Sequence, residues 1–288
     1  MKRLPMFRII TVLVVLSIGP VLPGCVSVPG GLSRGIVQAI SNQDDPATVR
    51  DGAPAYLLMI DGFVEDDPAN QRMLIAGARL YGSYAAVFAG DQERARRLAT
   101  RARSYGRRAL CGDYPRLCEG EHRPHEEFVR LLGTVGDNDI DALYAYGLTW
   151  AIWIQTHADD WNALADLSRA EAVMMRVVEL DPAHDTGQPY LYLGIMNSYL
   201  PPALGGNPET GRAYFEKAID LSHGANLSAK VEMAGRYARL VFDRPLHDRL
   251  LNEVIESDPV APGMTLSNTL ARQRARGLLD SSDEYFAE

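Results

Sequence analysis

The sequence is a chain of 288 residues with a formal net charge of −8, in which 47% of the residues are hydrophobic and 23% are charged. This composition is ordinary for a folded globular protein and excludes disorder over most of the chain. The acidic balance argues against a nucleic-acid partner, because binding to phosphates requires a basic face.

The N-terminus has the layout of a secretory signal. Basic residues at positions 2, 3 and 8 precede a short apolar run over 9–18, and Leu22-Pro23-Gly24-Cys25 follows. This layout is typical of a signal peptide rather than a membrane span. The ending resembles a bacterial lipobox, which predicts removal of residues 1–24 and lipidation of Cys25. An uncleaved N-terminal anchor is the alternative.

The residues after Cys25 indicate the cellular location of the chain. Val26, rather than an aspartate, follows the cysteine, which by analogy with enteric bacteria favours the outer membrane and a position facing the periplasm. Residues 25–35 are rich in Gly and Pro and are interpreted as a lipidated tether. Residues 36–288 are interpreted as a single helical domain.

Two cysteines remain in the mature chain, Cys111 and Cys118. In an oxidising periplasm this local spacing predicts a disulfide. Free thiols are one alternative, and a metal site that adds His122 and His125 is another. The spacing of the four residues is not a familiar zinc pattern, so we predict no metal and no cofactor.

Helical periodicity without convincing strand alternation predicts an all-α fold of about eleven or twelve helices. Asp45 and Pro46 are a start signal for a helix that ends near residue 66, and Pro54 within it is expected to kink or split the helix. Asn70 is expected to cap the next helix. Further helices are expected over 92–110, within 119–132, and over 137–155, 161–180, 190–200, 208–221, 227–242, 245–256 and 264–279.

The expected helix over 92–110 is rich in arginine. One interpretation is a face that binds an anion or a partner. The other is a solvated helix face, with Ala95, Ala99, Ala102 and Tyr105 packed inward. Arginine-rich helix faces are commonly solvent-exposed, which favours the second interpretation.

The segment Tyr190–Pro208 combines a helix, a Pro-Gly loop and the start of a second helix. Its first part carries large residues on several sides, which is typical of a helix buried between neighbours. The loop over 200–206 is not expected to be helical, because it holds two prolines and two glycines.

Four helix pairs share a repeated spacing. In tetratricopeptide units a small residue marks the first helix, small or apolar residues mark the second, and Pro ends it. Gly82, Gly147, Gly194 and Gly235 fit the first-helix position. The second-helix positions fit at Ala95, Ala99 and Ala102; at Ala170, Met174, Val177 and Pro182; at Gly211, Phe215 and Ala218; and at His247, Leu251, Val254 and Pro259. The pattern predicts a helical-hairpin solenoid of about four units with extra flanking helices and a concave surface lined by first helices.

Several segments resemble the TRAP-transporter T-component (TatT) family: the loop over 200–206, residues 215–222 and 231–238, the tail over 266–279 with 283–286, and the earlier segments 49–58 and 78–88. The resemblance implies a periplasmic lipoprotein of cryptic tetratricopeptide units, associated with tripartite ATP-independent periplasmic (TRAP) uptake through the substrate-binding subunit. It also implies a homo-oligomer, a trimer, with an internal cavity or pore for a hydrophobic small ligand.

No catalytic set is present in the sequence: it has no phosphate-binding loop, no Gly-x-Ser-x-Gly and no His-Glu-x-x-His. We therefore predict a binding component rather than an enzyme, with a general outer-membrane scaffold or assembly lipoprotein as the alternative. The candidate ligand or partner surface consists of Tyr146, Trp150, Trp153, Tyr190, Asn197, Tyr199, Pro201, Pro202 and Asn207. Plain core packing is the alternative for the aromatic residues, and capping is the alternative for Asn207.

Overall fold

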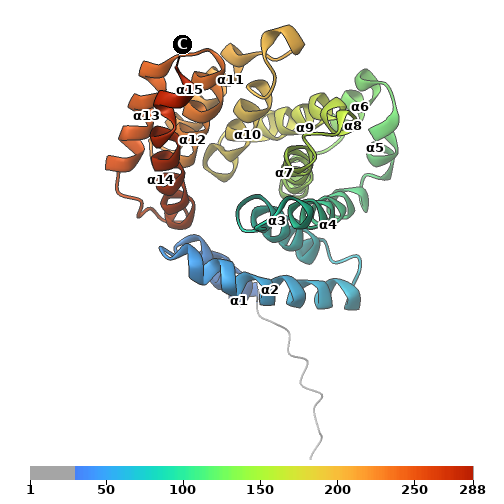
Figure 1. Ribbon diagram of the computed structural model, residues 1–288. Helices are drawn as coiled ribbons and strands as arrows, with labels where there is room; N and C mark the ends of the chain where they lie inside the picture. The colour runs from blue at the N-terminus through green and yellow to red at the C-terminus, as the bar shows by residue number, and fades with distance from the viewer. Residues whose placement is uncertain (1–29, 288) are drawn as a thin grey trace, which may run out of the picture.

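The computed structural model describes residues 30–287, which form helices and loops without a strand in that range (Figure 1). The all-α prediction is confirmed. The predicted signal peptide, residues 1–24, and the predicted lipidation site Cys25 lie outside the described residues.

The helices differ from those predicted mainly in number, because short helices occur in several connections. In chain order they are α1 (Gly30–Ser41), α2 (Pro46–Asp66), α3 (Gln71–Val87), α4 (Gln92–Cys111), α5 (Pro115–Glu119), α6 (His125–Leu132), α7 (Ile140–Thr156), α8 (Trp161–Ala165), α9 (Leu167–Leu180), α10 (Gln188–Asn197), α11 (Pro208–Leu221), α12 (Leu227–Glu232), α13 (Arg244–Glu256), α14 (Thr265–Asp280) and α15 (Ser282–Tyr285). Shorter turns are the 3₁₀ segments η1 (Gly120–His122), η2 (Asp137–Asp139), η3 (His184–Gly187) and η4 (Pro202–Leu204) and the π-helical segment η5 (Met233–Ala238).

Two local predictions need correction. Helix α1 begins at Gly30, inside the segment predicted to be a tether. Glycine weakens a helix by roughly 1 kcal/mol without preventing it. The loop over 200–206 contains the 3₁₀ turn η4, which Pro201 precedes and Pro202 begins. The carbonyl of Pro201 accepts from the N–H of Leu204 at 2.9 Å, and that of Pro202 accepts from the N–H of Gly205 at 3.0 Å.

Of the two effects predicted for Pro54, a kink or a split, the split does not occur in helix α2. It runs from Pro46 to Asp66 as one helix. A proline cannot donate to the carbonyl four residues earlier, which here belongs to Arg50. The hydroxyl of Tyr84 in α3 donates to that oxygen instead, at 3.0 Å. The neighbouring helix therefore satisfies the acceptor that the proline leaves free.

The helices pack as consecutive pairs. Contacts join α3 to α4, α7 to α9, α10 to α11, and the segment formed by α12 and η5 to α13. The first helix of each pair also contacts the first helix of the next, from α3 through α7 and α10 to α12 (Figure 1). This is the packing expected of a stack of helical hairpins.

The repeat positions account for the close packing of these pairs. Pro182 is exposed and Pro259 is half-buried, but the other predicted second-helix positions are buried: Ala95, Ala99, Ala102, Ala170, Met174, Val177, Gly211, Phe215, Ala218, His247, Leu251 and Val254. A Cβ atom on Gly147 would lie 2.8 Å from Val173 in α9, and one on Gly194 would lie 2.7 Å from the ring of Phe215 in α11. Only glycine allows the two helices of these pairs to approach so closely.

Gly235 does not make the corresponding contact. It lies in the π-helical segment η5, whose wider turn changes the direction of its side chains. The nearest atoms to a Cβ at this position belong to Leu278 and Arg274 of α14, not to α13. Gly235 therefore fits the sequence register of a first helix without contacting the second helix of its pair.

Helix α10 connects two hydrophobic cores. Its Leu193 and Met196 belong to the core that extends over α2 to α9, whereas its Leu191 and Ile195 belong to the core of α11 to α14. Both pairs are 5% exposed or less. The interpretation of α10 as a helix buried on several sides is confirmed.

The first and the last long helices of the described chain meet. Helices α1 and α2 contact α14, and the backbone N–H of Gly263 donates to the side-chain oxygen of Asn42 at 2.6 Å. Figure 1 shows α1 and α2, in blue, beside the lower end of the dark red α14. The helices therefore follow a closed path, which the sequence does not predict.

Candidate functional site

The aromatic residues predicted on α7 belong to the core. Tyr146 and Trp150 are both 0% exposed. The Tyr146 hydroxyl donates to Glu121 at 2.9 Å, and the Trp150 indole N–H donates to Asp166 at 3.2 Å. Burial raises the pKa of Tyr146 well above its ordinary value. Neither side chain offers surface to a ligand, so core packing, the alternative interpretation, describes both.

Arg103 from the basic helix α4 lies over these rings. Its guanidinium carbon is 4.1 Å from the ring centroid of Trp150 and 5.2 Å from that of Trp153. Its side chain is 17% exposed and faces the carboxylates of Glu121 at 3.6 Å and Asp166 at 3.9 Å. Burial lowers the pKa of Arg103. The solvated-face interpretation of α4 is therefore wrong for this arginine.

Cys111 and Cys118 are joined by a disulfide in the structure, with their Cα atoms 5.9 Å apart. The bond ties the end of α4 to α5 and η1, which carries Glu121. That carboxylate is 7% exposed and also pairs with Arg107 at 2.9 Å. The disulfide therefore fixes the segment that supplies a buried negative charge to Arg103.

The remaining predicted residues do not form one site. Asn197 is 9% exposed and donates to Glu171 at 2.7 Å, whereas Asn207 caps α11 by accepting from the backbone N–H of Thr210 at 3.4 Å. Tyr199 lies under the guanidinium of Arg236, at 5.9 Å. The other residues lie apart: Trp153 stacks on His157, Tyr190 lies near Tyr214, Pro201 is half-buried and Pro202 is exposed.

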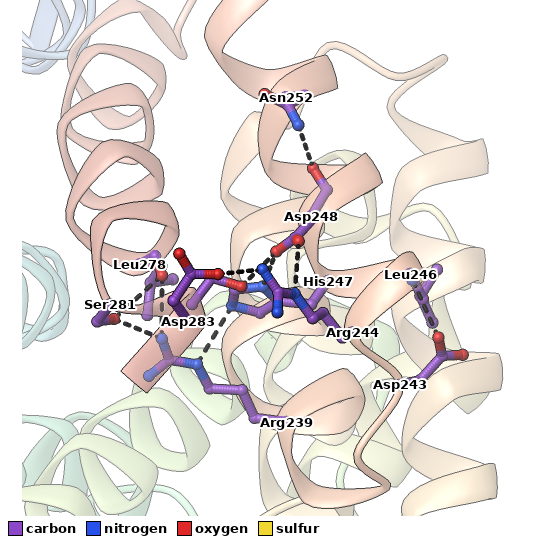
Figure 2. A network of polar contacts seen from close by, with 11 residues as sticks. Arg239, Asp243, Arg244, Leu246, His247, Asp248, Asn252, Leu278, Ser281 and Asp283 are labelled. Atoms are coloured by element: carbon purple, nitrogen blue, oxygen red, sulfur yellow. Dashed lines mark hydrogen bonds and ion pairs between the residues drawn. The ribbon is translucent and has the colours of Figure 1, made fainter. Parts of the chain in front are cut away.

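A polar network holds the C-terminal helices together around His247, which is 0% exposed (Figure 2). Arg239 donates to His247 Nε2 at 3.2 Å, and His247 Nδ1 is 2.8 Å from Asp248 Oδ1. Arg239 also donates to Ser281 in the turn between α14 and α15, and Ser282 donates to Asp248 at 2.7 Å. The network therefore ties both of these helices to α13.

This network is structural, although it joins a serine, a histidine and an aspartate. In a catalytic triad the serine hydroxyl donates to the imidazole. Here the imidazole acceptor Nε2 is taken by Arg239, and the Ser282 hydroxyl donates to Asp248 instead. Partial burial acts to raise the pKa of Asp248, but hydrogen bonds from Ser282, His247 and Arg244 outweigh it and lower that pKa.

A second set of polar residues runs across four consecutive first helices: Arg79 on α3, Tyr144 on α7, Tyr192 on α10 and Glu232 on α12. We call these four residues the first-helix strip. Arg79 pairs with Asp185 of η3, and its guanidinium carbon lies 5.3 Å from the ring centroid of Tyr144.

The charges of the strip influence one another. Burial raises the pKa of Tyr192, and the negative charges of Glu232 and Asp185 raise it further, while Arg79 opposes them. Burial acts to raise the pKa of Glu232, but the guanidinium groups of Arg236 and Arg274 outweigh it and hold that pKa below its usual range. The strip is thus a row of mutually influencing groups in which Tyr144 is 2% exposed and Glu232 13%, so that Arg79 and Arg274 beside Glu232 supply its exposed part.

The sequence contains a pattern that could have predicted part of the first-helix strip. Arg79, Tyr144 and Glu232 each lie three residues before a register glycine, and Tyr192 lies two residues before one. Residues at the same place in a repeat occupy equivalent positions on the same side of a stack. A comparison of the four repeats position by position could therefore have found Arg79, Tyr144 and Glu232, but not Tyr192, which is offset by one residue.

Two shallow depressions lie elsewhere on the described part of the molecule. One of about 440 Å³ is lined by α2 and α4, with Val64, Arg101 and Arg108 among its residues. The other, of about 310 Å³, is lined by α6 and α9. Neither includes a residue of the first-helix strip or the aromatic residues predicted for a tunnel. Among residues 30–287, no helix combines the length and the hydropathy that crossing a membrane requires.

The fold and the first-helix strip define an all-α scaffold built of stacked helical hairpins. The sequence matches the family described as TRAP transporter T-component over residues 42–286. The chain belongs to this family, as the sequence resemblance predicted. The family is that of a transporter component rather than of an enzyme. The comparison with curated proteins finds no match.

Proposed function

We propose that this protein is a lipid-anchored component of a TRAP-type uptake system that faces the periplasm and binds the substrate-binding subunit through the first-helix strip. The family match supports the transport system. The lipobox at residues 22–25 supports a lipid anchor at Cys25, and Val26 supports the outer membrane.

The main support for this docking surface is the alignment of four residues on consecutive first helices: Arg79, Tyr144, Tyr192 and Glu232. Solenoid proteins bind partners along such repeated surfaces. Arg79 keeps 41% of its side chain exposed, and Arg274 beside Glu232 keeps 47%. Arginine is among the residue types enriched at the centres of protein interfaces, whereas Tyr144, at 2% exposure, lies beneath Arg79 in the core.

Other functions have less support from the molecule. An apolar tunnel for a hydrophobic ligand would need Tyr146 and Trp150 on its wall, and both side chains are fully buried. A homo-oligomer and a general role in outer-membrane assembly remain predictions from sequence, without a described contact that favours either.

The proposal is tested by crosslinking in cells that carry a tagged copy of the full chain, followed by purification under denaturing conditions. The expected product is a crosslink to the substrate-binding subunit of a TRAP system. A matched sample from cells that express a tagged but unrelated lipoprotein controls for chance contacts. Crosslinks to outer-membrane assembly proteins alone, with altered outer-membrane protein levels on deletion, would contradict the proposal.

A further inference from the structure

The outer face of helix α2 is apolar and exposed. Val49, Ala53, Leu57, Ile60 and Val64 face the core on one side of the helix. A second stripe lies on the other side and contains Leu58 at 71%, Met59 at 43% and Phe63 at 37% exposure, together with exposed Ala55 and Gly62. Their spacing of three and four residues places these side chains on one face.

Helix α2 is therefore apolar nearly all round, although it is an edge helix. Between Gly52 and Val64 the only charged residue is Asp61, which turns away from the stripe and pairs with Arg101 at 2.9 Å. A helix of this pattern in a water-soluble protein is normally covered on both sides. Within the described chain α2 packs mainly on α3, and its outer stripe has no such cover.

We propose that this stripe lies on the surface of the lipid bilayer. The inference rests on the lipid anchor at Cys25 in the proposed function. Four residues lie between Cys25 and Gly30, where α1 begins, and the five steps from residue to residue span at most about 17 Å. Helix α1 leads directly to α2. An anchored chain therefore keeps α2 close to the membrane, where an apolar helix face inserts into the boundary between headgroups and acyl chains.

The size of the stripe favours a lipid surface over a second copy of the chain. At roughly 200 Å² for a large side chain, the exposed parts of Leu58, Met59 and Phe63 sum to about 300 Å². A stable protein interface buries about 800 Å² on each partner. A stripe that is held at the bilayer by a separate lipid anchor does not need that area.

The charges at the ends of the stripe indicate which kind of lipid surface it fits. Asp51, which precedes it, is paired with Arg50 at 2.8 Å, whereas Glu65, Asp66 and Asp67 follow it and are exposed. Carboxylates at these positions oppose contact with an anionic surface. The structure therefore fits an uncharged or zwitterionic lipid surface better than an anionic one.

The test uses the mature, lipidated chain in vesicles of phosphatidylcholine, with an environment-sensitive fluorophore on Met59→Cys. The matched control is Val129→Cys on α6, because Val129 has the same 43% exposure and α6 lies far from α2 in Figure 1. We expect phosphatidylcholine with brominated acyl chains to quench the label at position 59 at least twofold and to leave the label at position 129 unchanged. Leu58→Asp combined with Phe63→Asp should abolish the quenching at position 59.

Three outcomes would overturn the inference. If the mass of the chain shows the lipid on Cys25 but quenching is weak and equal at both positions, the membrane contact of the stripe is contradicted and the lipid anchor is not. If the label at position 59 is shielded from water but not quenched, and the chain can be crosslinked as a dimer, the stripe binds a second copy of the chain instead. A chain without lipid on Cys25 would remove the anchor, and with it this inference, while leaving the docking surface to its own test.

Discussion

The central hairpins and the C-terminal hairpin follow the same sequence register but are held together differently. In the central pairs, Gly147 and Gly194 allow the first helix to touch the second helix directly. In the last pair, Gly235 lies in a π-helical segment and faces α14. A shared register therefore predicts where helices pair, but not which neighbour each register residue touches.

The polar interactions differ in the same way. The core of α4 and α7 encloses the charged group of Arg103, Glu121 and Asp166, whose members come from three separate segments. In the C-terminal region the polar network around His247 ties α14 and α15 to the end of the stack (Figure 2). The first region depends on a buried charge balance, and the second on hydrogen bonds and an ion pair around a buried histidine.

The largest effect is expected from Glu121→Gln, which removes the buried negative charge that faces Arg103, Arg107 and Tyr146. Breaking a buried ion pair by removal of one partner costs about 3 kcal/mol or more. Urea unfolding should show a loss of this size. Glu93→Gln is the matched control, because the Glu93 side chain pairs with Arg97 but is 84% exposed. This substitution should change the free energy of unfolding by less than about 0.5 kcal/mol. Equal effects would contradict the described charge balance.

Reduction of the Cys111–Cys118 disulfide should have the next largest effect. Closing a loop of this length contributes about 2 kcal/mol through the entropy of the unfolded chain. Hydrogen exchange should accelerate in α5 and η1, next to Glu121, and should remain unchanged in α13 and α14. Uniform acceleration over the whole chain would show that the two regions are not held independently.

Gly194→Ala and Gly235→Ala test the difference in packing directly. A Cβ at position 194 would lie 2.7 Å from the Phe215 ring, whereas one at position 235 would lie 3.2 Å from the flexible end of Leu278. We expect a loss of about 1–2 kcal/mol at position 194 from overpacking. At position 235 we expect no loss, because alanine favours a helix by roughly 1 kcal/mol over glycine. Thermal unfolding distinguishes the two, and a loss at position 235 as large as that at 194 would show that both glycines cross their second helices.

The smallest effect concerns Glu232, whose pKa is held below its usual range by Arg236 and Arg274 against the effect of burial. A depressed carboxylate pKa stabilises the fold above the unfolded value, near 4.5, and this stabilisation is lost as the pH falls through the folded value. Glu232→Gln should therefore destabilise the chain by about 1 kcal/mol at pH 7 and by less as the pH falls below 4.5. A difference that does not vary with pH would contradict the ionic role.

The sequence was sufficient to predict the helical class, the family and the caps at Asp45 and Asn70, because these depend on local spacing and side-chain chemistry. It was not sufficient to predict the contact of α1 and α2 with α14, which joins residues more than two hundred positions apart. Tyr146 and Trp150 show the same limit for the site. An aromatic stripe on a helix has the same spacing whether it faces a ligand or the core, and only the neighbouring helices decide.

The central claim is that the first-helix strip binds the substrate-binding subunit. The most direct measurement is the Kd for that subunit, obtained by titration and compared between Arg79→Ala and Arg97→Ala. Arg79 lies on the strip, whereas Arg97 lies on α4, with 61% of its side chain exposed and paired to the exposed Glu93. Loss of Arg79 should weaken binding about tenfold, which corresponds to about 1.4 kcal/mol, while Arg97→Ala should leave the Kd within about twofold. Equal Kd values for both variants and the unaltered chain would contradict the account.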